Sequence, residues 1–176
     1  MDELALIEAA QKNPREFRHL YDKYYKPIFL FVFRRTDDES LTADITQQVF
    51  LKALQHIGSF RYKGVPFSAW LYRIASNEVV QHFRDNKKTR TVCLEASDIN
   101  AFAEESHHAL DVEKRETMFK ALGQLPMVDM EYIEMRFFEK RSFKEIGDIQ
   151  GITENNAKVK VYRILDKLKR LMTVDA

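Results

Sequence analysis

The sequence predicts an all-α protein of two small helical domains joined by a flexible linker, and two observations support this fold class. Apolar residues recur at the three- and four-residue spacing of amphipathic helices through residues 1–90 and again through residues 111–176. Between these segments, from Thr89 to Ala109, the periodicity fails and acidic residues accumulate. We therefore expect domains at residues 1–90 and 111–176, separated by an acidic linker at residues 91–110.

The charge follows the same division, although the formal net charge of the chain is only +1. Residues 61–90 hold seven Lys or Arg against two acids, whereas residues 91–116 hold two against seven. The uneven distribution of charge between these two segments is more informative about binding partners than the net charge of the whole chain.

The composition is that of a soluble globular protein, with 45% apolar and 31% charged residues. The single cysteine, Cys93, excludes an internal disulfide and fits a reducing compartment. No apolar run approaches the eighteen or so residues that span a bilayer, and residues 1–20 carry too many charges for a signal peptide. We expect a cytoplasmic protein without membrane insertion.

In the first domain, a helix should start at Asn13 and Pro14, and a second should run from about Leu41 to Ile57. Apolar residues at four-residue spacing form the buried stripe of the second helix: Ile45, Val49, Ala53 and Ile57. Its outward side carries Asp44, Gln47, Gln48, Leu51 and Gln55. Leu51 is either a scattered surface apolar residue or the centre of a protein-binding patch, and the residues alone leave both open.

A loop at residues 60–66 and a helix at residues 67–88 combine aromatic and basic side chains. Trp70, Leu71, Ile74 and Ala75 form the predicted apolar side of this helix. The loop contributes Arg61, Tyr62 and Lys63, and the basic and amide-bearing flank contributes Arg73, Asn77, Gln81, Arg84, Lys87 and Lys88. Rings beside cations suit single-stranded nucleic acid, whose bases stack while its backbone meets positive charge. Trp70 alone is either a core residue or a base platform.

In the second domain, helices are expected at about residues 110–122 and 126–138, and the latter should pack beneath a helix-turn-helix at residues 142–170. Ser142 and Glu145 have the spacing of a capping box. Gly147 allows a close approach of the next helix, Gly151 can take the left-handed conformation that ends the first one, and Thr153 is a candidate N-cap.

The second helix of this motif separates an apolar stripe from a polar, basic face. The stripe consists of Ala157, Val161, Ile164, Leu165 and Leu168. The opposite face carries Asn155, Asn156, Lys158, Val159, Tyr162 and Arg163. Cations, amides and a methyl-bearing side chain suit the major groove of DNA, although an ordinary solvated helix is the alternative.

Three segments in this order resemble the extracytoplasmic-function sigma factors, the compact two-domain specificity subunits of bacterial RNA polymerase. The segment DITQQVFL at residues 44–51 is similar to the family's D-x-x-Q-E-x-F-L helix, which docks on the polymerase clamp helices. The resemblance implies that Asp44, Gln47, Gln48 and Leu51 bind core polymerase. Gln48 departs from the usual Glu and lacks its charge.

The segment FSAWLYRIASN at residues 67–77 is similar to the family's F-x-x-W-L-x-x-I-A-x-N helix, which with the preceding loop opens the minus-ten promoter element. The resemblance assigns minus-ten contacts to Arg61, Tyr62, Lys63, Trp70, Arg73, Asn77 and Arg84. The family's acid four residues after the Asn is Gln81 here.

Leu125 and Pro126 followed by the helix-turn-helix resemble the family's domain that reads the minus-thirty-five element. This assigns minus-thirty-five contacts to Asn155, Asn156, Lys158, Val159, Tyr162 and Arg163. Asn155 and Asn156 replace the usual Gly-Thr and Val159 a common Ser, so promoter preference should differ from that of relatives. The family also implies core RNA polymerase, promoter DNA and an anti-sigma factor as partners.

No P-loop, H-E-x-x-H motif, dinucleotide-binding glycine pattern or nucleophile with its base is present, and His107 and His108 lack companion ligands. We therefore expect no catalytic residue, metal or cofactor. Two rivals remain, which are a stand-alone helix-turn-helix regulator and a helical enzyme with a DNA-binding tail. Promoter binding without core polymerase favours the first, and an activity lost on changing residues 2–88 favours the second.

Overall fold

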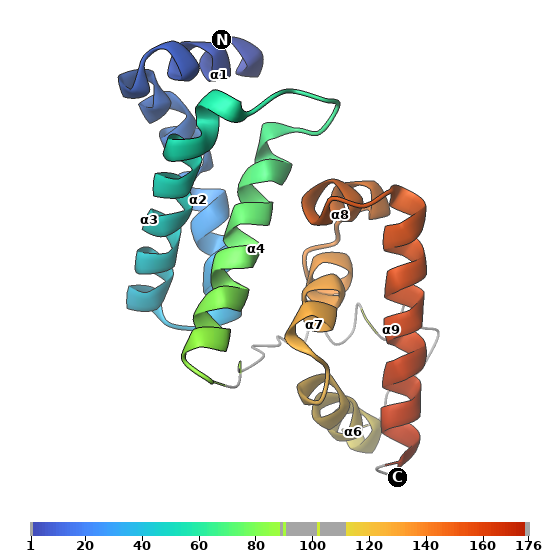
Figure 1. Cartoon of the computed structure of the whole chain (residues 1–176). Coiled ribbons are helices and arrows are strands. Elements are labelled where there is room, and N and C mark those ends of the chain that lie inside the picture. The colour runs from blue at the N-terminus through green and yellow to red at the C-terminus, as the bar shows by residue number, and fades with distance from the viewer. Residues whose placement is uncertain (1, 89, 91–101, 103–111, 175–176) are drawn as a thin grey trace. The chain divides into compact units, whose positions relative to one another are not determined.

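The computed structural model describes residues 2–88, 90, 102 and 112–174, and confirms the all-α fold class, with no strand in the described part of the chain (Figure 1). The chain divides into two compact units, Met1–Arg90 and Thr91–Ala176. None of the described helices is both long and apolar enough to cross a membrane. The predicted linker lies outside the described residues except for Phe102, which is buried with its ring centroid 5.0 Å from that of Phe137.

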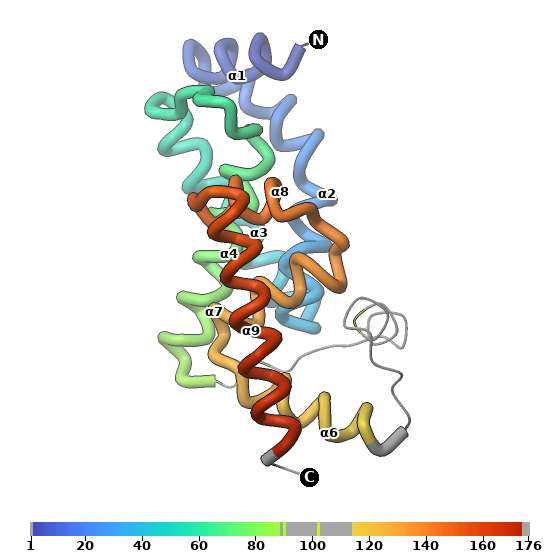
Figure 2. The backbone as a smooth tube through the Cα atoms, turned by 90° about the vertical axis from the view of Figure 1, so that its right-hand side faces the viewer, coloured from blue at the N-terminus to red at the C-terminus, as the bar shows by residue number. Residues whose placement is uncertain are grey.

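The first unit is a bundle of three long helices with a shorter one across its end (Figures 1 and 2). Its elements are α1 (Glu3–Lys12), η1 (Pro14–Glu16), α2 (Phe17–Thr36), α3 (Glu39–His56), η2 (Ile57–Ser59) and α4 (Phe67–Asp85). Helices α2, α3 and α4 pack pairwise, and α1 packs on α2. The fully buried residues at their centre include Leu20, Ile28, Val49, Phe67, Leu71 and Val79.

Two helix ends in this unit differ from the sequence prediction because backbone capping decides them. Helix α3 starts two residues earlier than predicted, since the Asp38 side chain accepts a hydrogen bond from the Leu41 backbone N–H at 2.8 Å. Helix α4 ends at Asp85 rather than at Lys88, because Lys87 takes the left-handed conformation with φ of 50°.

The second unit places its long C-terminal helix against three shorter ones. Its elements are α6 (Val112–Gly123), α7 (Met127–Ile133), the π-helical segment η3 (Glu134–Phe138), α8 (Phe143–Gln150) and α9 (Glu154–Val174). Helix α9 packs against α6, α7 and α8. The helix predicted at residues 126–138 changes its hydrogen-bonding register at Glu134, since the Glu139 N–H donates to the Glu134 carbonyl at 2.8 Å.

The turn between α8 and α9 is built as predicted. Ser142 and Glu145 form both bonds of the capping box, Gly151 ends α8 with φ of 72°, and the Thr153 hydroxyl accepts from the Asn156 N–H at 3.2 Å. At Gly147, an added Cβ would lie 2.8 Å from the Ile152 carbonyl oxygen and 3.2 Å from the Thr153 carbonyl carbon. Only glycine therefore lets the turn fold back this closely.

Replacing Gly147 by alanine should destabilise the second unit by about 2 kcal/mol, because backbone atoms rather than a flexible side chain must move. Urea unfolding followed by circular dichroism would measure this change. Gly123→Ala is the matched control, since a Cβ there meets nothing within 4 Å, and its effect should stay within about 0.5 kcal/mol. Equal losses for the two variants would contradict the close approach at Gly147.

Candidate functional site

The outward face of α3 carries the four residues predicted to bind polymerase. Asp44, Gln47, Gln48 and Leu51 are all exposed, whereas Ile45, Val49 and Ala53 on the opposite side are buried. Leu51 is 47% exposed, so it presents apolar surface at the centre of this polar face. The structure thus brings an apolar centre and a polar surround together on one face, while their role in binding stays a prediction.

The loop between η2 and α4 is fixed at its first residues and exposed beyond them. The Gln11 amide nitrogen on α1 donates to the carbonyls of Ile57 (3.0 Å) and Phe60 (2.9 Å), and the buried Phe60 ring packs edge-on against Phe67. Arg61 Nη1 donates to the carbonyls of Gly58 and Phe60, both at 2.9 Å. Sequence reasoning missed Gln11, because no local pattern signals a contact 46 to 49 residues away.

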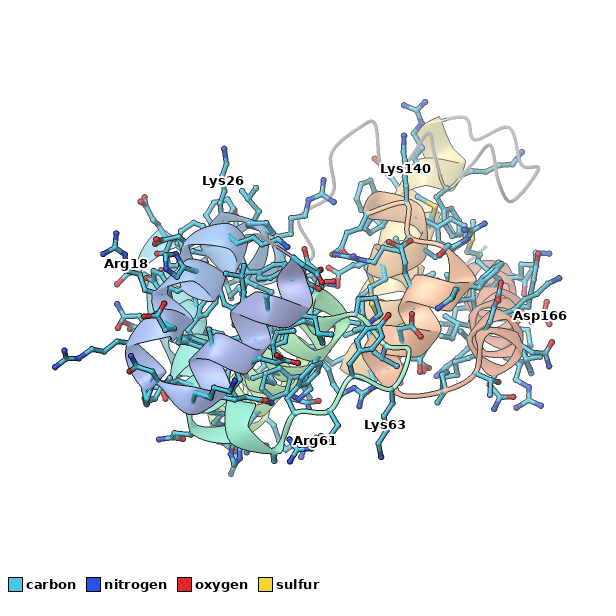
Figure 3. All side chains as sticks on the ribbon, turned by 90° about the horizontal axis from the view of Figure 1, so that it is seen from above. Arg18, Lys26, Arg61, Lys63, Lys140 and Asp166 are labelled. Carbon is cyan, nitrogen blue, oxygen red and sulfur yellow. The ribbon has the colours of Figure 1, made fainter. Side chains whose placement is uncertain are left out.

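The exposed part of this loop includes Arg61, Tyr62 and Lys63, the predicted minus-ten residues. Tyr62 is 61% exposed. Figure 3 shows the Lys63 side chain pointing outward from the loop, whereas the exposed Arg61 side chain turns back toward the carbonyls of Gly58 and Phe60. An exposed ring between two cations, on a backbone anchored at its start, is the arrangement that stacking on an unpaired base requires.

Trp70 does not belong to the buried side of α4, where the sequence analysis placed it. Leu71 and Ala75 are fully buried as predicted, but Trp70 and Ile74 are only half-buried. The tryptophan ring lies 5.1 Å from the Phe60 ring and 5.3 Å from the Phe67 ring, so one part packs on the loop's anchor. The aromatic character of Trp70 does not decide on which side of α4 it lies, because the helical repeat of 100° per residue places it toward the polar flank.

The remaining minus-ten candidates lie on that same flank of α4. Arg73, Asn77 and Arg84 follow Trp70 at offsets of three, seven and fourteen residues, which share one side of a helix. Asn77 and Arg84 are exposed and Arg73 is half-buried. A partly exposed indole, an amide and two guanidinium groups therefore share one surface strip, and their contact with DNA stays a prediction.

On α9, the division between buried and outward residues follows the prediction except at Leu165, which is half-buried. Ala157, Val161, Ile164 and Leu168 are buried. All six predicted minus-thirty-five residues are exposed, namely Asn155, Asn156, Lys158, Val159, Tyr162 and Arg163. Donors, acceptors and apolar groups of this kind match the edges of base pairs in a major groove.

The basic charge of α9 is partly neutralised from within the unit. Asp129 on α7 binds Lys160 through Oδ1 (3.1 Å) and Lys167 through Oδ2 (3.3 Å). Within the described part of the chain, Lys158 and Arg163 form no ion pair, so their charges remain available to an external anion. Sequence alone does not distinguish these cations, because the position of Asp129 is set by tertiary packing.

The ionised carboxylate of Glu145 stabilises the start of α8 as part of the capping box. The Ser142 backbone N–H donates to Glu145 Oε2 at 2.8 Å, and this bond lowers the pKa of Glu145 below its ordinary value of 4.5. Because the folded chain favours the ionised form, the bond stabilises the fold above that ordinary value and is lost as the pH falls through the lowered pKa.

No described group of three His, Cys, Asp or Glu residues lies close enough together to hold a metal ion. The pair His107 and His108 lies outside the described residues. The exposed faces described above offer hydrogen bonds, charge and stacking surface, which are the means of binding another macromolecule.

The sequence matches two family models, one over the unit that contains α3 and α4 and one over the unit that contains α9. Residues 20–89 match Sigma-70 region 2 and residues 121–170 match Sigma-70 region 4. The chain is also 30% identical to the ECF RNA polymerase sigma factor BldN of Streptomyces coelicolor over 178 residues, which cover 98% of this chain and 67% of the relative. This chain belongs to the extracytoplasmic-function (ECF) sigma factors. Sigma factors of this kind direct RNA polymerase to promoters.

Another sequence relative and two solved structures are also similar to this sigma factor. It is 27% identical to the ECF sigma factor SigM of Bacillus subtilis, with 86% of this chain and 92% of the relative covered. Its fold is similar to that of CnrH bound to the cytosolic domain of CnrY, with a TM-score of 0.59, 22% identity and coverage of 98% and 97%. It is also similar to RpoE bound to the anti-sigma factor NepR of Bartonella quintana, with a TM-score of 0.56, 20% identity and coverage of 92% and 99%.

Proposed function

We propose that this sigma factor divides promoter recognition among three surfaces. The outward face of α3 binds core RNA polymerase, the loop at residues 60–66 with the outer flank of α4 opens the minus-ten element, and the outward face of α9 reads the minus-thirty-five element. The observation that carries this proposal is the exposure of most of these side chains on helices whose opposite sides are buried. Arg73 and Trp70, which are half-buried, border the same strip.

The opening of the minus-ten element follows from the physical character of the loop. Extruding a base from the duplex costs a few kcal/mol, which stacking and backbone contacts must repay. Tyr62 supplies an exposed ring, while Lys63 and Arg61 supply positive charge. Gln11 holds the start of the loop, so less conformational entropy is lost when a base binds.

We further propose that an anti-sigma factor regulates this chain and that it acts in the cytoplasm without catalytic chemistry of its own. The solved structures of RpoE with NepR, and of CnrH with the cytosolic domain of CnrY, support such a partner by analogy of fold. RNA synthesis then belongs to the polymerase. Against the rival of a stand-alone regulator, we expect promoter protection only when core polymerase is added.

Replacing Tyr62 and Lys63 together by alanine should slow promoter opening by about tenfold, because a stacked base and one phosphate contact are lost. Permanganate reactivity of minus-ten thymines in the polymerase complex would measure the opening rate. A template with a preformed bubble at the minus-ten element is the control, and it should restore the normal rate of initiation. A defect that persists on the bubble template would place these residues outside the opening step.

A further inference from the structure

Three side chains from different elements of the second unit contact one another in a row that ends on the outward face of α9. The Arg136 guanidinium of η3 lies 4.3 Å from the centroid of the Phe143 ring of α8, within the range of a cation–π contact. The Phe143 ring lies in turn 6.3 Å from the Tyr162 ring of α9, tilted by 39°. Aromatic pairs attract one another at this separation.

The inner end of the row is fixed to the backbone. Arg136 Nη1 donates to the Arg141 carbonyl at 3.1 Å, and the Arg141 Nε forms an ion pair of 2.7 Å with Glu139. Phe143 is the first residue of α8 and directly follows Ser142, whose capping box sets its backbone. Phe143 therefore projects from a defined backbone position, backed by the guanidinium on one face.

The outer end of the row is open to a ligand. Tyr162 is 52% exposed, and within the described residues its hydroxyl forms no hydrogen bond. An exposed tyrosine on a helix surface can occupy more than one rotamer. Contact with Phe143 favours one of them and leaves the hydroxyl free to bind an external donor or acceptor.

We infer that Phe143 is a positioning residue for promoter specificity, which acts by holding the Tyr162 ring in one orientation on the minus-thirty-five face. This inference rests on the proposed function of α9. Phe143 need not touch DNA itself. Its effect arises because a fixed hydroxyl discriminates between base edges better than one that moves among rotamers.

The test compares base preferences at each minus-thirty-five position, using run-off transcription with core polymerase on a randomised upstream element. Phe143→Leu should lower discrimination about tenfold at the same positions as Tyr162→Ala. In the Tyr162→Ala background, Phe143→Leu should produce no further change. Phe143→Tyr retains the ring and should preserve the wild-type preference.

Phe119→Leu is the control, because it makes the same change at a surface phenylalanine of the same unit: Phe119 on α6 is 40% exposed, whereas Phe143 is half-buried, and only the Phe143 ring contacts the Tyr162 ring among the described residues. It should leave the preferences unchanged, and unfolding midpoints should confirm that every variant is folded at the assay temperature. A uniform loss over all sequences, or additive effects of the Phe143 and Tyr162 changes, would overturn the inference.

The same assay separates failure of this inference from failure of the proposed function. If Tyr162→Ala changes nothing while Lys158→Ala weakens upstream recognition, Phe143 has nothing to position and the inference falls, but the assignment of α9 stands. If neither change affects upstream recognition, both fall.

Discussion

Replacing Asp44 and Leu51 together by alanine is expected to weaken the binding of core RNA polymerase by about 100-fold, because central contacts carry most of an interface's binding energy. Leu51 presents the exposed apolar surface of α3, and Asp44 lies on the same face nearly two turns away. Fluorescence anisotropy of a labelled sigma factor titrated with core enzyme would measure the affinity.

The control for this experiment is a variant with the same two residue types changed elsewhere in the first unit. Leu4 on α1 is 45% exposed and Asp22 on α2 is exposed, so Leu4→Ala with Asp22→Ala removes a comparable surface. It should change the affinity less than threefold, as expected away from a central contact. If the control weakens binding as much as the double change on α3, that helix is not the docking face.

Replacing Lys158 and Arg163 by alanine is expected to weaken recognition of the minus-thirty-five element between about 10- and 100-fold at moderate salt, while polymerase binding is spared. Both side chains are exposed on α9. Each lost phosphate contact should reduce the slope of log affinity against log salt by about 0.9. Measuring promoter affinity of the polymerase complex at several salt concentrations gives both quantities.

A matched loss of charge in the first unit serves as the control. Arg18→Ala with Lys26→Ala also removes one Arg and one Lys from exposed positions on α2, where Figure 3 shows both side chains pointing outward. This variant should keep the wild-type salt slope.

If the α3 and α9 variants instead fail at the same step of initiation, the division of labour between the two units is wrong.

Local signals in the sequence were sufficient for the helix-turn-helix. Its capping box, its left-handed glycine and its N-cap each depend on a few neighbouring residues, and all three are confirmed. The outward face of α9 followed from helical periodicity alone. Such features are predictable because the chemistry that fixes them lies within one or two turns of the chain.

Features that depend on contacts between distant residues were not predictable in the same way. Gln11 holds the loop from another helix, and Asp129 on α7 forms ion pairs with two lysines of α9. The sequence leaves Trp70 open between a core residue and a base platform, and only the packing of its ring against Phe60 and Phe67 decides that the ring is partly covered and partly exposed.

The carboxylate of Asp129 has a consequence for how this sigma factor searches a genome. By pairing with Lys160 and Lys167, this single negative charge offsets one of the two positive charges that would otherwise attract any DNA duplex. The C-terminal unit should therefore bind non-specific DNA more weakly than it would without Asp129. Its binding to a promoter then depends on its attachment to polymerase, which raises its effective concentration there. Weak non-specific binding favours rapid dissociation from DNA sites that are not promoters.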